Sequence, residues 1–166
     1  MVDGLQEVYL EVTRGCPLRC ISCQSNAGLP HKNEIPFSDW VRIVDEAAEM
    51  GATSFVLSGG EPFTSPFFEE LCNDIHEEER ELSVQTSGKV YDTDRTTYIN
   101  EDRLRFLSEI EGVRLVFRLE GATEETHEDT TLIKGSYVKT VESIERAMNL
   151  GIYTEVCYTP TQINFH

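Results

Sequence analysis

Short apolar segments alternate with longer amphipathic segments along most of this chain. The apolar segments predict five strands, at residues 7–13, 53–58, 82–87, 113–119 and 152–158. Apolar residues between the strands recur at helical spacing, which predicts a helix in each intervening segment that carries this pattern. The order of elements is therefore strand, helix, strand, with few interruptions.

Four helices are predicted from this spacing and from their end signals. The first two follow Ser38 (Trp40, Ile43, Val44, Ala47) and Ser65 (Phe67, Phe68, Leu71, Ile75), with Pro66 suited to a first helical position. The third runs from about Glu101 to Ile110, with Asn100 as a candidate cap and Gly112 past its end, and the fourth carries Tyr137, Val138, Val141, Ile144 and Met148 and stops at Gly151. Residues 89–100 are expected to form a polar loop.

This alternation predicts an α/β fold with parallel strands joined by right-handed crossovers. A full eight-unit (βα) barrel takes about 250 residues, so a chain of 166 residues would hold about five units. The chain ends at residues 159–166, just after the fifth strand and without a helix to cover it. We therefore expect one domain over residues 1–166, a partial parallel-sheet barrel truncated at its C-terminus, unless the sheet closes differently.

Composition and charge narrow the classes of function. The formal charge of −16, from 30 acidic and 14 basic residues, disfavours a nucleic-acid partner. The sequence has no export signal and no apolar run long enough to span a bilayer, so we expect a cytoplasmic protein without a membrane partner. In that reducing compartment Cys72 and Cys157 are expected to be thiols and not a disulfide.

Three cysteines form the most informative motif. Cys16, Cys20 and Cys23 follow the first predicted strand at a spacing that brings three thiolates within reach of one metal centre. Iron–sulfur cubes usually have four Cys ligands, so a set of three leaves one iron open to a ligand that is not protein.

Other chemical segments follow the other strands. They are Ser58-Gly59-Gly60-Glu61-Pro62, Thr86-Ser87-Gly88, Glu120-Gly121-Ala122-Thr123 and Thr159 to Asn164. In α/β sheets and barrels ligands bind at the C-terminal ends of the strands, so these segments are expected to meet at one rim. Glycines there permit close approach of a ligand, and a carboxylate such as that of Glu61 can receive an ammonium group. Turn formation and local capping are the simpler explanation of each segment taken alone.

Together these residues resemble the radical S-adenosylmethionine (SAM) superfamily. The resemblance rests on Cys16-x3-Cys20-x2-Cys23 and Gly59-Gly60-Glu61-Pro62, and it continues through residues 119–127 and 135–137. It is strongest to the branch of peptide maturases, haem-pathway enzymes and the molybdenum cofactor cyclase. Asn26-Ala27-Gly28 after the last cysteine favours the first two of these groups.

The resemblance implies a specific chemistry. Cys16, Cys20 and Cys23 would hold a [4Fe-4S] cluster whose open iron binds SAM, and reductive cleavage of SAM would give a 5'-deoxyadenosyl radical that abstracts hydrogen from a substrate. The residues implied to contact SAM are Gly59, Gly60, Glu61, Thr86, Ser87, Arg118 and Glu120, with Cys157 and Tyr158 near the adenine. Gly60 and Glu61 are assigned to the methionine amino group. The implied partners are a reductase, flavodoxin or ferredoxin as electron donor, and a peptide or a tetrapyrrole or other cofactor precursor as substrate.

The chain departs from the family pattern at several positions. Ser22 stands where an aromatic residue or histidine is common, and Arg118 stands where many members have serine, so Arg118 is a candidate partner of the SAM carboxylate. The usual arginine after the histidine is missing, and Arg118 or Lys134 is expected to replace it. His127 is expected to be a local hydrogen-bonding group and not a ligand.

Two other classes of function stay open from the sequence. His31 could complete a zinc site with the cysteines, which would make the chain a small structural metal module, although no second ligand pair is present. The chain could also carry an iron–sulfur cluster without catalysis, as an electron carrier or degenerate scaffold. The intact Gly59-Gly60-Glu61-Pro62 turn disfavours this last interpretation.

Overall fold

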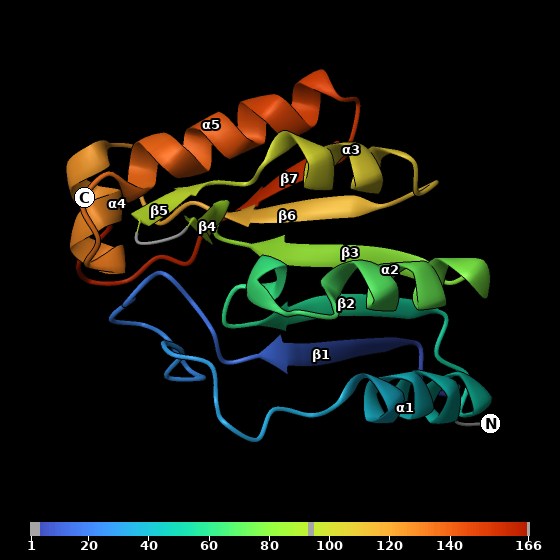
Figure 1. The fold of residues 1–166 in the computed structure, drawn as a ribbon. Coiled ribbons are helices and arrows are strands. Elements are labelled where there is room, and N and C mark those ends of the chain that lie inside the picture. Colours follow the sequence, from blue (N-terminus) through green and yellow to red (C-terminus); the bar gives the residue numbers. More distant parts are fainter. Residues whose placement is uncertain (1–3, 93–94, 166) are drawn as a thin grey trace.

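Five parallel strands form the central sheet. The computed structural model describes residues 4–92 and 95–165. The sheet has the order β1-β2-β3-β6-β7 (Figure 1). Its strands are β1 (Glu7–Thr13), β2 (Ser54–Gly59), β3 (Glu81–Thr86), β6 (Arg114–Arg118) and β7 (Tyr153–Cys157). Each lies within one residue of its predicted range, and all neighbouring pairs are parallel, so the predicted α/β class is confirmed.

Helices cover one face of this sheet (Figure 1). The predicted helices are present as α1 (Phe37–Glu49), α2 (Phe68–Glu77), α3 (Glu101–Ser108) and α5 (Ser136–Asn149). Alternate strand residues face them and form one buried core with the helices, among them Leu10, Phe55, Leu57, Val84, Leu115 and Phe117. The Asn100 side chain accepts a hydrogen bond from Arg103 N, as its predicted capping role requires.

The opposite face of the sheet is largely polar toward its C-terminal edge. Glu11 on β1 is paired in register with Ser58 on β2, and Arg118 on β6 with Cys157 on β7. Polar residues that alternate with core residues along buried strands leave one face free for a ligand. This second face and its C-terminal edge therefore position the candidate site.

The segment predicted as a polar loop contains a β-hairpin instead. Strands β4 (Lys89–Asp92) and β5 (Arg95–Tyr98) pair antiparallel. The prediction failed because charged and hydroxyl residues mask the β-forming residues Val90, Tyr91 and Tyr98. Residues 93 and 94 of the predicted loop lie outside the described residues.

Two helix predictions are also corrected. Helix α4 (Glu124–Thr131) was not predicted, because its sequence has no apolar periodicity; a cap at Thr123, whose Oγ1 accepts from Thr126 N at 3.3 Å, marks its start. Pro66 is not the first residue of α2. It lies in a turn between a short 3-10 helix, η1 (Pro62–Thr64), and α2, which begins at Phe68. Within the described ranges, no helix combines the length and apolar character needed to cross a bilayer.

Candidate active site

A cavity of about 360 Å³ lies at the C-terminal edge of the sheet. Its walls include all three motif cysteines and six of the seven predicted SAM contacts: Cys16, Cys20, Cys23, Gly59, Gly60, Thr86, Ser87, Arg118 and Glu120. Ser22 and Thr159 also line it, whereas Cys157 and Tyr158 do not. Segments far apart in the sequence therefore meet at one rim, because the parallel strands all end there.

The three cysteines are free thiols that differ in exposure. Cys16 is buried, Cys20 is half-buried and Cys23 is exposed. Burial raises the pKa of the Cys16 thiol to about 12 and that of Cys20 to about 11. Both thiols are therefore protonated at neutral pH in the metal-free chain, and a metal centre must displace their protons to bind the thiolates.

Elements distant in sequence hold the cysteine loop on two sides. The backbone N–H groups of Arg19 and Ile21, on either side of Cys20, donate to the carbonyls of Thr131 (3.1 Å) and Thr130 (3.0 Å) at the end of α4. On the other side, the Tyr91 hydroxyl of the β4–β5 hairpin donates to Cys16 O at 2.7 Å. The unpredicted helix and hairpin thus both fix the loop that carries the thiols.

The glycine pair joins the cysteine loop to the end of β2. Gly60 N donates to Thr13 O and Glu61 N donates to Gly15 O, each at 2.7 Å. A Cβ atom on Gly60 would lie 2.3 Å from Gly15 O, so no other residue fits there without moving the backbone. Glycine is required at position 60 because the turn after β2 packs directly against the backbone of the cysteine loop.

Glu61 lies beneath the cavity and does not line it. Its side chain is fully buried, and its two oxygens accept hydrogen bonds from the Thr86 hydroxyl (2.7 Å), Ser87 N (2.8 Å) and the Ser87 hydroxyl (2.6 Å). Burial raises the pKa of this carboxyl, against the effect of the hydrogen bonds from Ser87 and Thr86. The assignment of Glu61 to a ligand amino group stays a prediction; in the structure its carboxylate connects the loop after β2 with the end of β3.

Arg118 and Glu120 form an ion pair in the cavity wall. Arg118 Nη2 and Nε donate to Glu120 Oε1 at 2.8 and 3.1 Å. The Arg118 side chain is 38% exposed and that of Glu120 only 5%, so the guanidinium faces the open part of the site. Glu120 Oε2 is buried and has no partner among the described residues. This oxygen is an acceptor that a ligand hydroxyl or ammonium group could satisfy.

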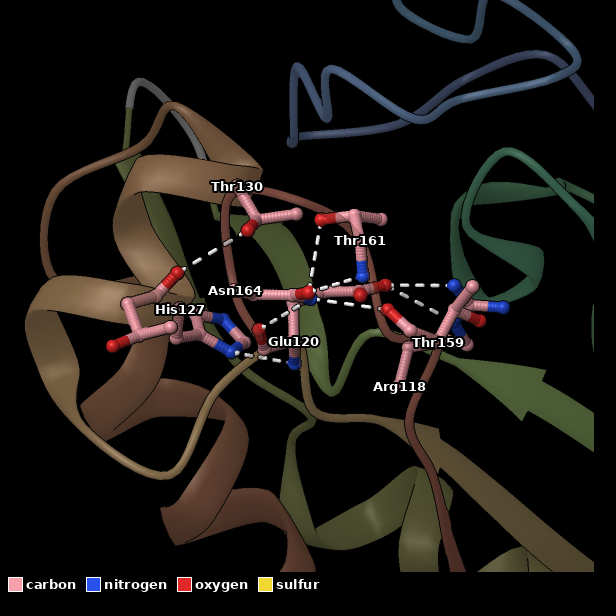
Figure 2. A network of polar contacts seen from close by, with 8 residues as sticks. Arg118, Glu120, His127, Thr130, Thr159, Thr161 and Asn164 are labelled. Atoms are coloured by element: carbon pink, nitrogen blue, oxygen red, sulfur yellow. Dashed lines mark hydrogen bonds and ion pairs between the residues drawn. The ribbon is translucent and has the colours of Figure 1, made fainter. Parts of the chain in front are cut away.

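A polar network holds the Glu120 backbone in place (Figure 2). His127 Nδ1 accepts from Glu120 N at 3.1 Å, which makes His127 the local hydrogen-bonding group that was predicted. Asn164 Nδ2 donates to Glu120 O (3.0 Å) and Thr159 O (3.1 Å), and Asn164 Oδ1 accepts from Thr161 N (2.6 Å). Asn164 was not singled out in the sequence; its position in the segment after the fifth strand was the only signal available.

Two residues considered from the sequence lie elsewhere. Lys134 is 85% exposed, pairs with Glu128 at 3.4 Å and does not line the cavity. His31 lines a separate hollow beside β1 together with Glu34, so it is not placed to complete a metal site with the cysteines. In residues 4–92 and 95–165, no three His, Cys, Asp or Glu side chains converge as ligands of a single ion. An iron–sulfur cube takes one thiolate per iron and does not require such convergence.

His127 gives stability a specific pH dependence. Burial lowers its pKa to about 4, whereas an unfolded histidine titrates near 6.5. Between these values the unfolded chain binds a proton that the folded chain does not, so the free energy of unfolding falls as pH drops from about 6.5 to about 4. In the wild type, His127 should account for a fall of about 2 kcal/mol in the free energy of unfolding between pH 7 and pH 5. We expect His127→Asn to lack this fall, because Asn Oδ1 can accept the Glu120 N–H but does not titrate. Urea unfolding at both pH values measures it.

The exposed His31 supplies the control for this experiment. His31→Asn should follow the wild-type pH profile, because His31 lies outside the network around Glu120. A wild-type profile in His127→Asn would contradict the assigned role of the imidazole.

Comparison with known proteins identifies the fold and the family. The sequence model of the Radical SAM superfamily matches residues 10–164. The AdoMet-dependent heme synthase of Methanosarcina barkeri is 28% identical over 147 residues, which are 87% of this chain and 40% of that protein. The PqqA peptide cyclase of Ruegeria pomeroyi is 39% identical over 79 residues, 47% of this chain and 21% of that protein. This chain thus spans two fifths or less of the length of these relatives.

A solved structure shares the architecture. SuiB of Streptococcus suis, bound to S-adenosylmethionine, superposes with a TM-score of 0.77 at 17% identity over 93% of this chain and 34% of that one. The predicted partial barrel of parallel strands is confirmed by this likeness. Because the family's sequence model covers nearly all of residues 1–166, including the three cysteines and the glycine turn, the protein belongs to the radical SAM superfamily.

Proposed function

We propose that residues 1–166 are the radical-generating core domain of an enzyme that modifies a peptide or makes a tetrapyrrole or another cofactor. Cys16, Cys20 and Cys23 would hold a [4Fe-4S] cluster, the characteristic cofactor of the superfamily, and SAM would occupy the adjoining cavity. The observation that carries the proposal is one cavity whose wall includes the three motif thiols together with Gly59, Gly60, Arg118 and Glu120.

The residues present fit this pair of cofactors. Among the residues that the structure describes, three free thiols and no fourth line the cavity, which matches a cluster with one open iron. Beside them the wall offers glycine backbone, the half-exposed Arg118 guanidinium and the unpartnered Glu120 Oε2. A molecule with an ammonium group, a carboxylate and ribose hydroxyls has a complementary partner for each of these groups.

When bound, the cluster supplies one electron that cleaves SAM into methionine and a 5'-deoxyadenosyl radical, which takes a hydrogen atom from the substrate. The chain's own residues would bind SAM and orient it. The backbone of Gly59 and Gly60 would receive the amino group, and the Arg118 guanidinium would receive the carboxylate. Glu120 would accept a ribose hydroxyl, while Thr86 and Ser87, whose hydroxyls donate to Glu61, can still accept hydrogen bonds.

The substrate class rests on the similar proteins. Of the two relatives described above, the one that matches 87% of this chain is named a heme synthase, and the one that is 39% identical is named a peptide cyclase. Both classes are therefore part of the proposal. The free thiols and the proposed cluster are suited to a reducing cytoplasm, where a reductase, flavodoxin or ferredoxin would donate the electron.

Anaerobic reconstitution with iron and sulfide tests the proposal. The protein should turn brown and retain about four irons per chain. With dithionite and SAM it should release methionine and 5'-deoxyadenosine, which chromatography detects. Tight binding of a single zinc ion without SAM cleavage would instead support a structural metal module and refute the enzyme function.

Arg118 allows the SAM contacts to be tested separately from the cluster. We expect Arg118→Leu to weaken SAM binding about tenfold or more, because a charge-assisted hydrogen bond is worth about 1.5–3 kcal/mol, and to leave iron content unchanged. Isothermal titration of the reconstituted protein measures the affinity. Arg114→Leu is the matched control, since Arg114 lies at the other end of the same strand and pairs with Glu81. Equal affinity in both variants would remove Arg118 from the site.

A further inference from the structure

We propose that the outer face of the cysteine loop is the docking surface for an acidic, one-electron carrier protein. This docking patch consists of Arg14, Arg19 and Leu29 around Cys23. The inference rests on the proposed function, because it concerns the delivery of an electron to the same cluster. It adds the location of the partner and the chemistry that recognises it.

The charge of the cysteine loop differs from that of the rest of the chain. Residues 13–36 contain Arg14, Arg19 and Lys32 against the single acidic residue Glu34, which leaves 11 basic and 29 acidic residues for the remainder. A negatively charged partner is therefore repelled by most of the surface and admitted at this loop. Such a contrast selects the orientation in which an acidic partner approaches.

The two arginines of the docking patch differ in their partners from seven other arginines that the structure describes. Seven arginines form ion pairs with acidic side chains: Arg42, Arg80, Arg103, Arg105, Arg114, Arg118 and Arg146. Arg14 and Arg19 contact backbone carbonyls instead, and neither has an acidic partner among the side chains that the structure describes. Glu34 lies close by, since its Oε1 accepts from the Arg14 backbone N–H at 2.9 Å, but it is the single acidic residue beside three basic ones in residues 13–36. The loop therefore keeps a net positive charge that can attract an acidic surface.

The patch surrounds the most exposed thiol. Cys23 Sγ accepts from Ala27 N at 3.3 Å, and the next residue, Gly28, exchanges backbone hydrogen bonds with Arg14 and Cys16, each at 2.8 Å. A side chain on Gly28 would begin 3.7 Å from Arg19 Cζ, so this guanidinium lies directly over the same turn. Both charges are therefore within one turn of the thiol through which an electron would enter.

An apolar residue stands beside these charges. Leu29 follows Gly28 and is 81% exposed, the highest value among the large apolar residues of the described chain. A small apolar contact with a charged rim is suited to weak, transient electron-transfer complexes, which bury less than about 1,200 Å². In the reaction the carrier is oxidised by one electron and the bound cluster is reduced by one, with no other co-reactant.

The experiment compares two reductants on the reconstituted protein. Stopped-flow absorbance follows cluster reduction by photoreduced flavodoxin and, separately, by dithionite at low ionic strength. We expect Leu29→Asp and Arg14→Glu each to slow reduction by flavodoxin at least tenfold. Reduction by dithionite, a small anion that needs no docking surface, should slow several times less than reduction by flavodoxin in the same variant. High salt should bring the rate of reduction by flavodoxin in Arg14→Glu closer to the wild-type rate, because surface charges are then screened.

Arg42→Glu is the matched control for charge. Arg42 is 63% exposed on α1, away from the cysteine loop, so its reversal should leave the flavodoxin rate near that of wild type. Wild-type flavodoxin rates in both patch variants would overturn the inference, as would an equal loss in Arg42→Glu. If dithionite also fails to reduce wild type, the proposed function itself is wrong.

Discussion

Cys20→Ala should reduce the iron retained after reconstitution from about four per chain to nearly none and abolish SAM cleavage. Within the described part of the chain, the cavity offers three thiols. Cys20 is the central one, held between the two hydrogen bonds that Arg19 N and Ile21 N make to the end of α4. Two remaining thiolates cannot hold a cube that already has an open iron. Iron and sulfide assays, with the visible spectrum, measure the loss.

Cys72→Ala separates this effect from a general loss of thiols. Cys72 is buried in the core on α2 and does not line the cavity. Both variants keep four of the five cysteines, yet only Cys72→Ala should assemble the cluster. Full iron content in Cys20→Ala would contradict the assignment of the three ligands.

Gly60→Ala should damage both stability and cluster assembly. The new methyl group would lie 2.3 Å from Gly15 O and 2.9 Å from Arg14 C, which are backbone atoms that cannot rotate away. Relief requires separating the cysteine loop from the end of β2 and lengthening the two backbone hydrogen bonds between them. We expect a loss of about 3 kcal/mol, or a fall in Tm of about 6–12 °C, with reduced iron content.

Gly28→Ala is the corresponding control. A methyl group there would meet only the Arg19 guanidinium, at 3.7 Å or more, which is ordinary contact with a mobile side chain. Thermal unfolding should therefore show a lower Tm for Gly60→Ala than for Gly28→Ala. Similar Tm values for the two variants would show that the backbone junction at Gly60 is not tight.

The sheet could be predicted because its strands are buried against helices and their sequences reflect it. In β2, for example, Phe55, Val56 and Leu57 form a short apolar run between Ser54 and Ser58, and such a bounded run is typical of a buried strand. Helix α4 and the β4–β5 hairpin lack that signal. They are stabilised by contacts with the rest of the molecule, among them the Tyr91 hydrogen bond to Cys16 O, and such contacts leave no periodic trace in the sequence.

The site was predictable in its location and less so in the role of each residue. Topology alone places Cys16, Gly59 and Glu120 at one rim, whatever their side chains do. It does not show that Glu61 is directed inward to Thr86 and Ser87, because the direction of a side chain in a turn depends on tertiary packing. The pairing of Arg118 with Glu120 likewise became visible only in three dimensions.

The hydrogen bonds between the cysteine loop and the end of α4 also constrain biosynthesis. The cysteines lie near the start of the chain, but Thr130 and Thr131, which accept hydrogen bonds from their loop, are made more than a hundred residues later. At roughly 5–20 residues per second, a ribosome takes several seconds to cover that interval. During this time the nascent chain carries reduced, unanchored thiols that oxygen or stray metal can reach. Delivery of iron and sulfur should therefore follow emergence of α4, and protection of Cys16, Cys20 and Cys23 until then falls to the cell.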